Sequence, residues 1–403
     1  MTLAARPDHV PEALFWPHDI ESFAAEGEDP FLSLARLHDG PDIVWSPDIG
    51  RGRAGWILTR FDALQDAYRN PNLFSRAETS ELSRMVGEDW RLNPLEIEPP
   101  HHAAYRQVLQ PAFQPRAIAA LDDKVRAIAG ELIDRFEDRD GCEFVADFAS
   151  QFPSYVFMAL MGLPREDLPQ LLEWENAFMR GPDFEARAAA ARRIVGYLKR
   201  QMAEREETPR DDLISTILAA RIDGRPLDYN ERMGMCFVLY AGGLDTVASS
   251  LGWHLRHLAR DPDLQRRLQE NPADIAAAAD ELLRAFGVVA SHRYVTADVD
   301  FHGVAMKRGD FVVMSTHLAG RDPRRYADPH RIDIDRHDLH LTLGAGVHNC
   351  LGMHLARREI RIVLEEFTRR FSNIRIPDGA PVDWHTRNIL GVKHMPLEWK
   401  RAS

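Results

Sequence analysis

Residues 343–352 combine a cysteine with several glycines immediately before a predicted amphipathic helix that runs to Phe371. At a helix start, unpaired backbone N–H groups and the positive end of the helix dipole stabilise an anionic sulfur and lower its pKa. We expect Gly346 and Gly352 to let the backbone approach a flat ligand closely, because glycine has no Cβ. A metal bound by the Cys350 thiolate is the natural interpretation of this segment; a buried structural cysteine is the alternative, which a lone cysteine favours and which the segments described next argue against.

A second segment with chemical potential lies inside a long predicted helix, residues 230–260. Its two consecutive glycines cost the helix about 1 kcal/mol each relative to alanine, so they need a reason. An acid beside an alcohol in an apolar wall can deliver protons, and missing side chains leave room for a small ligand. The alternative is a close helix crossing with a surface aspartate and a threonine bonded back to its own helix. Helical spacing places one stripe of residues together, namely Val238, Ala241, Gly242, Asp245, Thr246 and Ser249.

A carboxylate and a guanidinium lie three residues apart on the helix predicted for residues 272–286. By itself such a pair, here Glu281 and Arg284, usually decorates a solvated face. A turn-rich stretch follows at residues 321–333 and contains a further arginine, Arg331. A carboxylate between two arginines would fix this irregular segment behind the cysteine loop.

The elements that position these residues are mostly helical. Apolar residues at three- and four-residue steps predict helices over residues 117–136, 183–205, 210–221, 230–260, 272–286 and 351–371. Strand-like segments are shorter and scarcer, at residues 43–45, 55–59, 294–296, 301–304 and 311–314. The predicted fold class is mostly α with a small β part. Because the composition stays even along the chain, we expect a single domain over residues 1–403, with residues 1–29 as an N-terminal extension.

The composition excludes several classes of protein. With 45% hydrophobic and 28% charged residues, the chain is neither fibrous nor wholly disordered. A net charge of −12 disfavours nucleic acid and anionic membrane as partners. Three widely spaced cysteines encode neither a disulfide framework nor a zinc ribbon. The longest clearly apolar stretch, residues 233–243, is shorter than the roughly 20 residues that span a bilayer, so we expect a cytoplasmic protein.

The order and spacing of these segments resemble those of the cytochrome P450 haem-thiolate monooxygenases over nearly the whole chain. The resemblance implies the cytochrome P450 fold with haem b (iron protoporphyrin IX) as cofactor. It makes Asp245 and Thr246 the catalytic acid and alcohol, and Glu281, Arg284 and Arg331 the structural triad. Cys350 becomes the axial ligand of the haem iron. The other implied cofactor-binding residues are His102, Arg106, Arg293 and His348 at the haem propionates and Gly242, Gly346 and Gly352 along the haem.

Residues 242–247, 301–304 and 354–360 look most like the bacterial camphor-hydroxylating branch of the family. In that branch a tyrosine hydrogen-bonds the substrate ketone; here Trp90 stands in its place, which argues against camphor itself. Leu343 replaces the usual phenylalanine beside the sulfur, which leaves the iron potential open. A monoterpenoid or norisoprenoid fits the nearly all-apolar pocket that the resemblance implies. The implied pocket residues are Trp90, Leu95, Val238, Ala241, Val289, Ile389 and Leu390.

Electrons must come from another protein, because the sequence shows neither a flavin fingerprint nor a cysteine cluster for an iron–sulfur centre. The resemblance implies a two-iron two-sulfur ferredoxin, reduced by an NAD(P)H-dependent flavoprotein, and dioxygen as co-substrate. We expect Arg106, Arg357 and Arg358 to form a basic patch for the ferredoxin, or else an ordinary charged helix face. Three alternatives remain open: a haem-thiolate peroxygenase or dehydratase, a non-catalytic haem sensor, and a copper site at Cys350, Met353 and His354.

Overall fold

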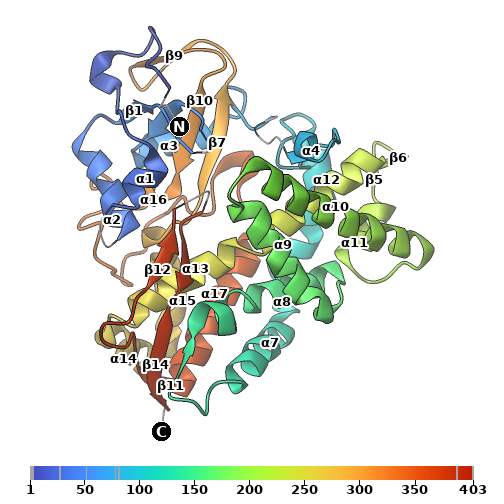
Figure 1. Cartoon of the computed structure of the whole chain (residues 1–403), viewed down its shortest axis with the longest axis vertical. Coiled ribbons are helices and arrows are strands. Elements are labelled where there is room, and N and C mark those ends of the chain that lie inside the picture. Colours follow the sequence, from blue (N-terminus) through green and yellow to red (C-terminus); the bar gives the residue numbers. More distant parts are fainter. Residues whose placement is uncertain are drawn as a thin grey trace. The chain divides into compact units, whose positions relative to one another are not determined.

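The computed structural model describes residues 4–26, 29–50, 52–77, 79, 82–386 and 389–401 (Figure 1). The chain forms two compact units, each assembled from three separate segments. Unit 1 contains Met1–Thr79, Trp253–Cys350 and Val382–Lys393, and unit 2 contains Ser80–Gly252, Leu351–Pro381 and His394–Ser403. Helices dominate and strands are short, so the predicted mostly α class with a small β part is confirmed.

Unit 1 is built on a five-stranded sheet in the order β1-β2-β10-β7-β3. β2 and β10 run parallel, and the other neighbours are antiparallel. β7 and β10 lie side by side in Figure 1. Every residue of β1 and β2 is buried, which explains why these strands read as apolar runs without alternation. The strands of this sheet are β1 (Ile43–Ser46), β2 (Gly55–Leu58), β3 (Phe74–Ser75), β7 (Ala290–Val295) and β10 (Phe311–Ser315).

The strands predicted at residues 43–45, 55–59 and 311–314 are confirmed as β1, β2 and β10, and residues 294–296 extend past the end of β7. The strand predicted at residues 301–304 is wrong. His302 and Gly303 have φ values of 50° and 79° and form the turn of a hairpin between β8 (Val299–Phe301) and β9 (Val304–Met306). A second strand pair joins β12 (Asp383–His385) to β13 (Gly391–His394).

Short helices complete unit 1. The predicted N-terminal extension, residues 1–29, includes residues 1–3 and 27–28, which lie outside the described residues. It contains α1, which packs against α2 in the residues that follow it. The helices are α1 (Ile20–Ala24), α2 (Pro30–Ala35), α3 (Phe61–Arg69), α14 (Pro262–Glu270), α15 (Ile275–Ala285) and α16 (Thr316–Ala319).

Unit 2 is mainly helical and has a large apolar core. The helix predicted for residues 117–136 is divided in two, α6 and α7, whereas the one predicted for 183–205 is the single helix α10. The helices are α4 (Leu82–Met85), α5 (His102–Leu109), α6 (Pro115–Ala119), α7 (Asp122–Asp134), α8 (Phe152–Met161), α9 (Leu168–Arg180), α10 (Phe184–Glu207), α11 (Leu213–Ala219), α12 (Tyr229–Gly243) and α17 (Met353–Arg370). The strands are β4 (Gly141–Glu143), β5 (Arg221–Ile222), β6 (Arg225–Pro226), β11 (Phe371–Arg375) and β14 (Pro396–Arg401).

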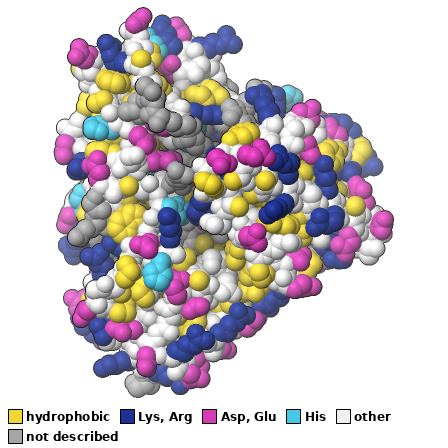
Figure 2. Space-filling view, viewed as in Figure 1, with side chains coloured by type: hydrophobic (Ala, Val, Ile, Leu, Met, Phe, Trp, Pro, Cys, Tyr) yellow, Lys and Arg dark blue, Asp and Glu magenta, His cyan; other side chains and the backbone are white. Residues whose placement is uncertain are grey.

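The surface of unit 2 around α10 and α11 carries side chains of both signs. Figure 2 shows Lys and Arg lying among Asp and Glu over this region. In unit 2, ion pairs join Arg192 to Glu185 on α10 at 2.5 Å and Arg193 on α10 to Glu173 on α9 at 3.7 Å. Mixed charge of this kind is a solvated face rather than a single-sign binding surface.

The long helix predicted for residues 230–260 is interrupted. α12 ends at Gly243, and α13 (Thr246–Leu258) starts after Leu244 and Asp245. Two adjacent glycines weaken the helix at this point. By length and composition, the stretch Tyr229–Leu258 is the one described segment able to cross a membrane, but 67% of its apolar window is buried. A buried core helix passes the same test. The sequence analysis expected a shorter apolar run, residues 233–243, and did not identify the longer stretch.

Candidate functional site

The cysteine lies at the end of a closed loop in unit 1. The Cys350 N–H donates to the Leu343 carbonyl at 2.8 Å, and a short 3-10 helix, Gly346–His348, lies between them. α17 begins at Met353, three residues after the cysteine rather than at it. Cys350 is exposed, and the predicted cofactor residue His348 is half-buried in the same loop.

The other two cysteines are poor candidates for a thiolate ligand. Burial raises the pKa of Cys142 far above its ordinary value, and the carboxylates of Asp147 and Glu143 raise it further. Burial likewise raises the pKa of Cys236 to about 12. Both side chains therefore stay protonated at neutral pH. The exposed Cys350 is the cysteine whose surroundings fit an axial thiolate.

Tyr68, at the end of α3, links the cysteine loop to another predicted cofactor residue. Its ring lies 5.6 Å from the guanidinium of Arg293, which is buried on β7. A Cβ added at Gly346, where φ is +69°, would lie 2.4 Å from the Tyr68 carbonyl oxygen. Gly346 is therefore needed for a close approach to protein backbone, and the ligand contact predicted for it is not what excludes a side chain there. Gly352 is the N-cap residue of α17.

His102 and Arg106 lie one turn apart on α5 in unit 2. His102 is 4% exposed, and Arg106 is half-buried. Spacing of four residues puts both side chains on the same face of the helix. A buried imidazole and a guanidinium on one face form a donor set suited to a carboxylate.

The predicted acid and alcohol lie at the break between α12 and α13. The Thr246 hydroxyl donates to the Gly242 carbonyl at 3.1 Å, as in the alternative of a back-bonded threonine. Asp245, in contrast, is 7% exposed, so the surface aspartate of that alternative is wrong. A Cβ placed on Gly242 would meet no described atom within 4 Å, whereas one on Gly243 would collide with the Phe157 ring. The break thus combines a buried acid, a hydroxyl and open space.

Arg180 is a residue of this site that the sequence analysis missed. It lies at the last position of α9, and its Nη2 contacts Asp245 Oδ1 at 2.5 Å. The Ser249 hydroxyl approaches the same oxygen at 3.5 Å. Apolar residues at helical spacing, beginning at Leu168 and Leu171, could have revealed α9. No local pattern indicates that its last residue pairs with an acid 65 positions away.

Four of the predicted pocket residues share the apolar cluster of unit 2. Leu95, Val238 and Ala241 are half-buried against it, whereas Trp90 is 2% exposed and belongs to its interior. The Trp90 ring lies 4.9 Å from the Phe237 ring. Its indole N–H donates to Glu88 Oε2 at 2.7 Å. In this structure the indole N–H is therefore engaged within the protein, consistent with the expectation that Trp90 does not replace the ketone-binding tyrosine of the camphor branch.

The other three predicted pocket residues lie together in unit 1. Val289 and Ile389 form an antiparallel bridge, and the Leu390 N–H donates to the Val288 carbonyl at 3.0 Å. Leu390 and Val288 also line a pocket of about 40 Å³. A volume of this size holds a few water molecules rather than a terpenoid.

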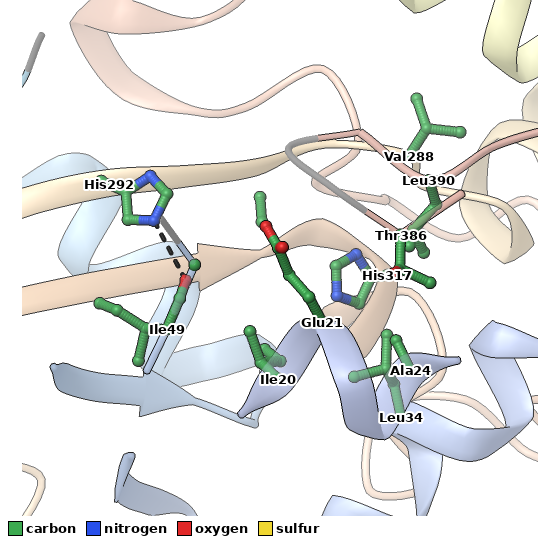
Figure 3. Close-up of a pocket in the computed structure, with 12 residues that line it drawn as sticks. Ile20, Glu21, Ala24, Leu34, Ile49, Val288, His292, His317, Thr386 and Leu390 are labelled. Atoms are coloured by element: carbon green, nitrogen blue, oxygen red, sulfur yellow. Dashed lines mark hydrogen bonds between the residues drawn. The ribbon is translucent and has the colours of Figure 1, made fainter. Parts of the chain in front are cut away.

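The polar side of this pocket is formed by a glutamate and two histidines. In the view of Figure 3, the Glu21 side chain lies between those of His292 and His317, and His292 hydrogen-bonds the Ile49 carbonyl at 3.3 Å. Burial lowers the pKa of His317 to about 4. His317 is therefore neutral at physiological pH.

The carboxylate between two arginines is present, but one arginine differs from the prediction. Glu281 accepts two hydrogen bonds from Arg284, at 2.7 and 2.8 Å. The second guanidinium on Glu281 belongs to Arg336, at 3.4 Å. The predicted Arg331 is wrong in this role, since it contributes its backbone carbonyl, which accepts from Arg284 at 3.2 Å. The Asp333 N–H also donates to Glu281, so the irregular segment turns back onto the carboxylate at several points.

The predicted basic patch is smaller than expected. Arg358 forms a two-point contact with Asp122 on α7 and approaches Glu365 at 3.7 Å. Its charge is thus neutralised within unit 2. Arg106 and Arg357 remain as candidates for contact with a partner.

These residues fit the haem predicted from the sequence. An exposed sulfur in the loop that leads into α17 suits an iron ligand, and Arg293 and His102 supply buried donors suited to carboxylates. Gly242 leaves open space beside the Asp245–Thr246 pair. The ligand, the donors and the acid–alcohol pair are each present in a form that the cofactor can use.

Comparison with known proteins agrees with the predicted haem. The family model described as Cytochrome P450 matches residues 156–401. A protein of Sinorhizobium fredii, "Probable cytochrome P450 127A1", is 36% identical over 98% of this chain and 96% of its own length. "Cytochrome P450-terp" of Pseudomonas sp is 30% identical over 99% of both chains.

Solved structures give a consistent result. CYP101J2 superposes with a TM-score of 0.87 at 32% identity, covering 98% of this chain and all of its own. Cytochrome P450 CYP101C1 superposes with a TM-score of 0.88 at 33% identity, with the same coverage. The similarity of this chain to these proteins thus extends over nearly its whole length, in sequence and in fold.

Proposed function

The chain belongs to the cytochrome P450 family, and from this premise we propose that it hydroxylates an unactivated carbon of a small apolar, terpenoid-like substrate. As a member of the family it is a monooxygenase with haem b as cofactor, and it uses dioxygen and an external redox partner. When bound, the haem supplies the redox chemistry of dioxygen. Cys350 would hold its iron, and His102, Arg106, Arg293 and His348 would hold its propionates.

Asp245 and Thr246 are the proposed proton-handling residues. Asp245 holds a buried negative charge against Arg180, and the Thr246 hydroxyl is fixed on the Gly242 carbonyl. A hydroxyl both donates and accepts hydrogen bonds, so Thr246 can pass on a proton that Asp245 supplies. The observation that carries this role is the burial of Asp245 at a helix break with open space beside Gly242.

An apolar substrate follows from the surroundings of the predicted pocket residues. Leu95, Val238 and Ala241 present partly buried apolar side chains, and the Trp90 N–H is engaged by Glu88. Burial of an apolar substrate against such a wall is favourable, because apolar surface is removed from water. The wall offers few hydrogen-bond partners to a sugar or nucleotide. The name of one relative, Cytochrome P450-terp, supports a terpenoid. We place monoterpenoids and norisoprenoids, other than camphor, first among the candidates.

The proposed electron donor is a two-iron two-sulfur ferredoxin with an NAD(P)H-dependent flavoprotein reductase, in the cytoplasm. Arg106 and Arg357 are the proposed contacts with an acidic ferredoxin surface, and Arg358 is left out because Asp122 neutralises it. Charges at the edge of such an interface act mainly on the rate of association.

The cofactor assignment is tested by the ferrous carbonyl spectrum of purified protein. The wild type and Cys142→Ala should give a sulfur-ligated band, and Cys350→Ala should lose it. A band of the histidine type in wild type would contradict the assignment of Cys350.

The substrate class is tested by spin-state titration against a panel of terpenoids, sugars and nucleosides. Terpenoids should convert the haem to the high-spin form, and the polar compounds should not. Product formation should then need reduced ferredoxin. Equal turnover with peroxide alone would favour the alternative of a peroxygenase.

A further inference from the structure

A second buried carboxyl group shares Arg180 with Asp245. Glu175 lies five residues before Arg180 on α9, and its Oε2 is 3.6 Å from Arg180 Nη1. Asp245 Oδ1 is much closer to the same guanidinium, at 2.5 Å from Nη2. The side chains of Glu175 and Asp245 are 7% and 8% exposed. One guanidinium thus faces two carboxyl groups that are both removed from water.

The two carboxyl groups cannot both be ionised at low cost. Two carboxylates and one guanidinium would leave an uncompensated negative charge in a buried place. Asp245 has the short contact and is the carboxylate, whereas Glu175 is too far from Arg180 for a hydrogen bond. Burial raises the pKa of Glu175 to about 8, and the charge of Asp245 contributes to the rise. At neutral pH, Glu175 therefore carries a proton beside the Asp245–Arg180 pair.

Two tyrosines also lie at this part of unit 2: Tyr240 feels the charge of Glu175, and Tyr197 in turn acts on Tyr240. Tyr240 on α12 donates its hydroxyl to the Leu171 carbonyl at 2.8 Å, and Tyr197 on α10 donates to Asp167 at 2.8 Å. Burial raises the pKa of both tyrosines above the ordinary value. They stay neutral over the range in which Glu175 titrates, so neither tyrosine supplies a charge that changes in that range.

Each carboxyl group also has one buried oxygen that makes no hydrogen bond to the described residues. These oxygens are Oε1 of Glu175 and Oδ2 of Asp245. Asp245 uses Oδ1 for Arg180 and Ser249. Buried polar atoms without a partner are uncommon and call for an explanation.

We propose that Glu175 is a positioning residue that exchanges protonation state with Asp245 on Arg180. The O–H bond of Glu175 breaks and an O–H bond forms on Asp245, while the Arg180 guanidinium moves to the new Glu175 carboxylate. The proton count and the net charge of the cluster stay the same. The exchange leaves Asp245 protonated and released from Arg180, next to Thr246.

This inference rests on the proposed proton-handling role of Asp245. An aspartate paired with an arginine is an acceptor and has no proton to give. Releasing it without a substitute carboxylate would also give up the short charge-assisted contact of Arg180 with Asp245, which is costly in a buried place. Glu175 removes both obstacles, because it provides the proton and then the counter-charge.

The first test uses the wild-type holoenzyme and needs no variant. Infrared difference spectra between about pH 7 and about pH 9 should show the carbonyl stretch of a protonated buried carboxylic acid disappearing as pH rises. The signal should be absent in Glu175→Gln and present in Glu173→Gln. If the wild-type difference spectrum lacked this band, or if the band were still present in Glu175→Gln, the proposal would be overturned.

The second test measures turnover with saturating ferredoxin. Glu175→Gln has the shape of the protonated acid but can neither give a proton nor accept Arg180 as a counter-ion. We expect kcat to fall by about tenfold with unchanged KM and carbonyl spectrum. In wild type, kcat should fall as pH rises through about 8, and this limb should vanish in Glu175→Gln. Glu175→Asp, which keeps a titratable group, should restore the limb.

Two controls separate the possible failures. Glu173→Gln makes the same charge change on the same helix at an exposed position and should match wild type. Slow turnover in Asp245→Asn with normal turnover in Glu175→Gln would overturn the role of Glu175 alone. Normal turnover in Asp245→Asn would overturn the proton-handling function, and the exchange with it.

Discussion

The indole N–H of Trp90 donates to Glu88, which also accepts from two residues of neighbouring helices. Lys199 on α10 approaches Glu88 Oε1 at 2.8 Å, and the Tyr229 hydroxyl approaches Oε2 at 3.1 Å. Trp90 is thereby fixed in the apolar cluster with its ring against Phe237. The residue that stands in place of the ketone-binding tyrosine thus has its polar group hydrogen-bonded within the protein.

Trp90→Phe should therefore change stability more than ketone recognition. The variant keeps an aromatic ring against Phe237 but leaves Glu88 without one donor. We expect the free energy of unfolding to fall by about 2 kcal/mol, as for a hydrogen bond to a charged group. Spin-state titration should give unchanged affinity for terpenoid ketones.

A contrasting result would identify a direct contact. If Trp90→Phe weakened ketones by about tenfold, or about 1.4 kcal/mol, and left terpenoid hydrocarbons unchanged, the N–H would have to bond the substrate. Glu88→Gln is the control, since it retains an acceptor for the indole and removes the charge facing Lys199.

Thr246→Ala should separate electron flow from product formation. The variant removes the hydroxyl that donates to the Gly242 carbonyl at the helix break. Haem binding and NADH consumption should persist, while reduced oxygen leaves as peroxide, because the proton delivery has lost its last donor. The measurement is the ratio of product to NADH consumed.

Ser250→Ala is the matched control for that ratio. Its hydroxyl donates to the Thr246 carbonyl at 2.9 Å, so it is another back-bonded hydroxyl on α13. Coupling as tight in Thr246→Ala as in Ser250→Ala would contradict the proposed role of Thr246.

Features encoded by neighbouring residues were the ones that sequence reasoning could find. A capping box of Asp228 and Glu231, three residues apart, starts α12, and a box of this kind depends on neighbouring residues alone. The contact of Glu281 with Arg284 spans one helical turn, and the cysteine loop and α17 are continuous in the chain. Spacing is sufficient in these cases because the backbone geometry of a helix or a tight loop fixes where the side chains go.

Features that depend on the path of the chain were missed. Arg336 rather than Arg331 reaches Glu281, because the turns between them decide which guanidinium comes back. Arg180 meets Asp245 across 65 residues. The break after Gly243 was also missed. Two glycines weaken a helix, but whether it breaks there depends on packing that the sequence does not show.

Arg284→Met tests the corrected cluster around Glu281. Both members of the pair are 1% exposed, so removal of the guanidinium leaves a buried carboxylate with its weaker partner, Arg336. We expect a loss of about 3–5 kcal/mol in the free energy of unfolding. Arg331→Ala keeps the backbone carbonyl that Arg284 uses and should cost less than about 0.5 kcal/mol. Denaturant titration of the holoenzyme checks both values, and equal losses would reinstate Arg331 as the second side chain on Glu281.

Buried histidines in unit 1 should make the fold sensitive to acid. Burial lowers the pKa of His254 from 6.5 to about 3 and that of His317 to about 4. Between these values and 6.5 the unfolded chain binds protons that the folded chain does not, so stability falls as pH falls. Each histidine contributes a slope of up to about 1.4 kcal/mol per pH unit in this window.

Denaturant unfolding of the holoenzyme from about pH 7.5 down to about pH 5 measures the slope of stability against pH. The other titratable groups are shared by wild type and variant, so the difference between their slopes reports the substituted histidine. His254→Gln should reduce the slope, because glutamine takes up no proton in the unfolded chain. His337→Gln, at an exposed position, is the control and should leave the slope as in wild type. An unchanged slope in His254→Gln would show that His254 does not enter the folded structure in its neutral form.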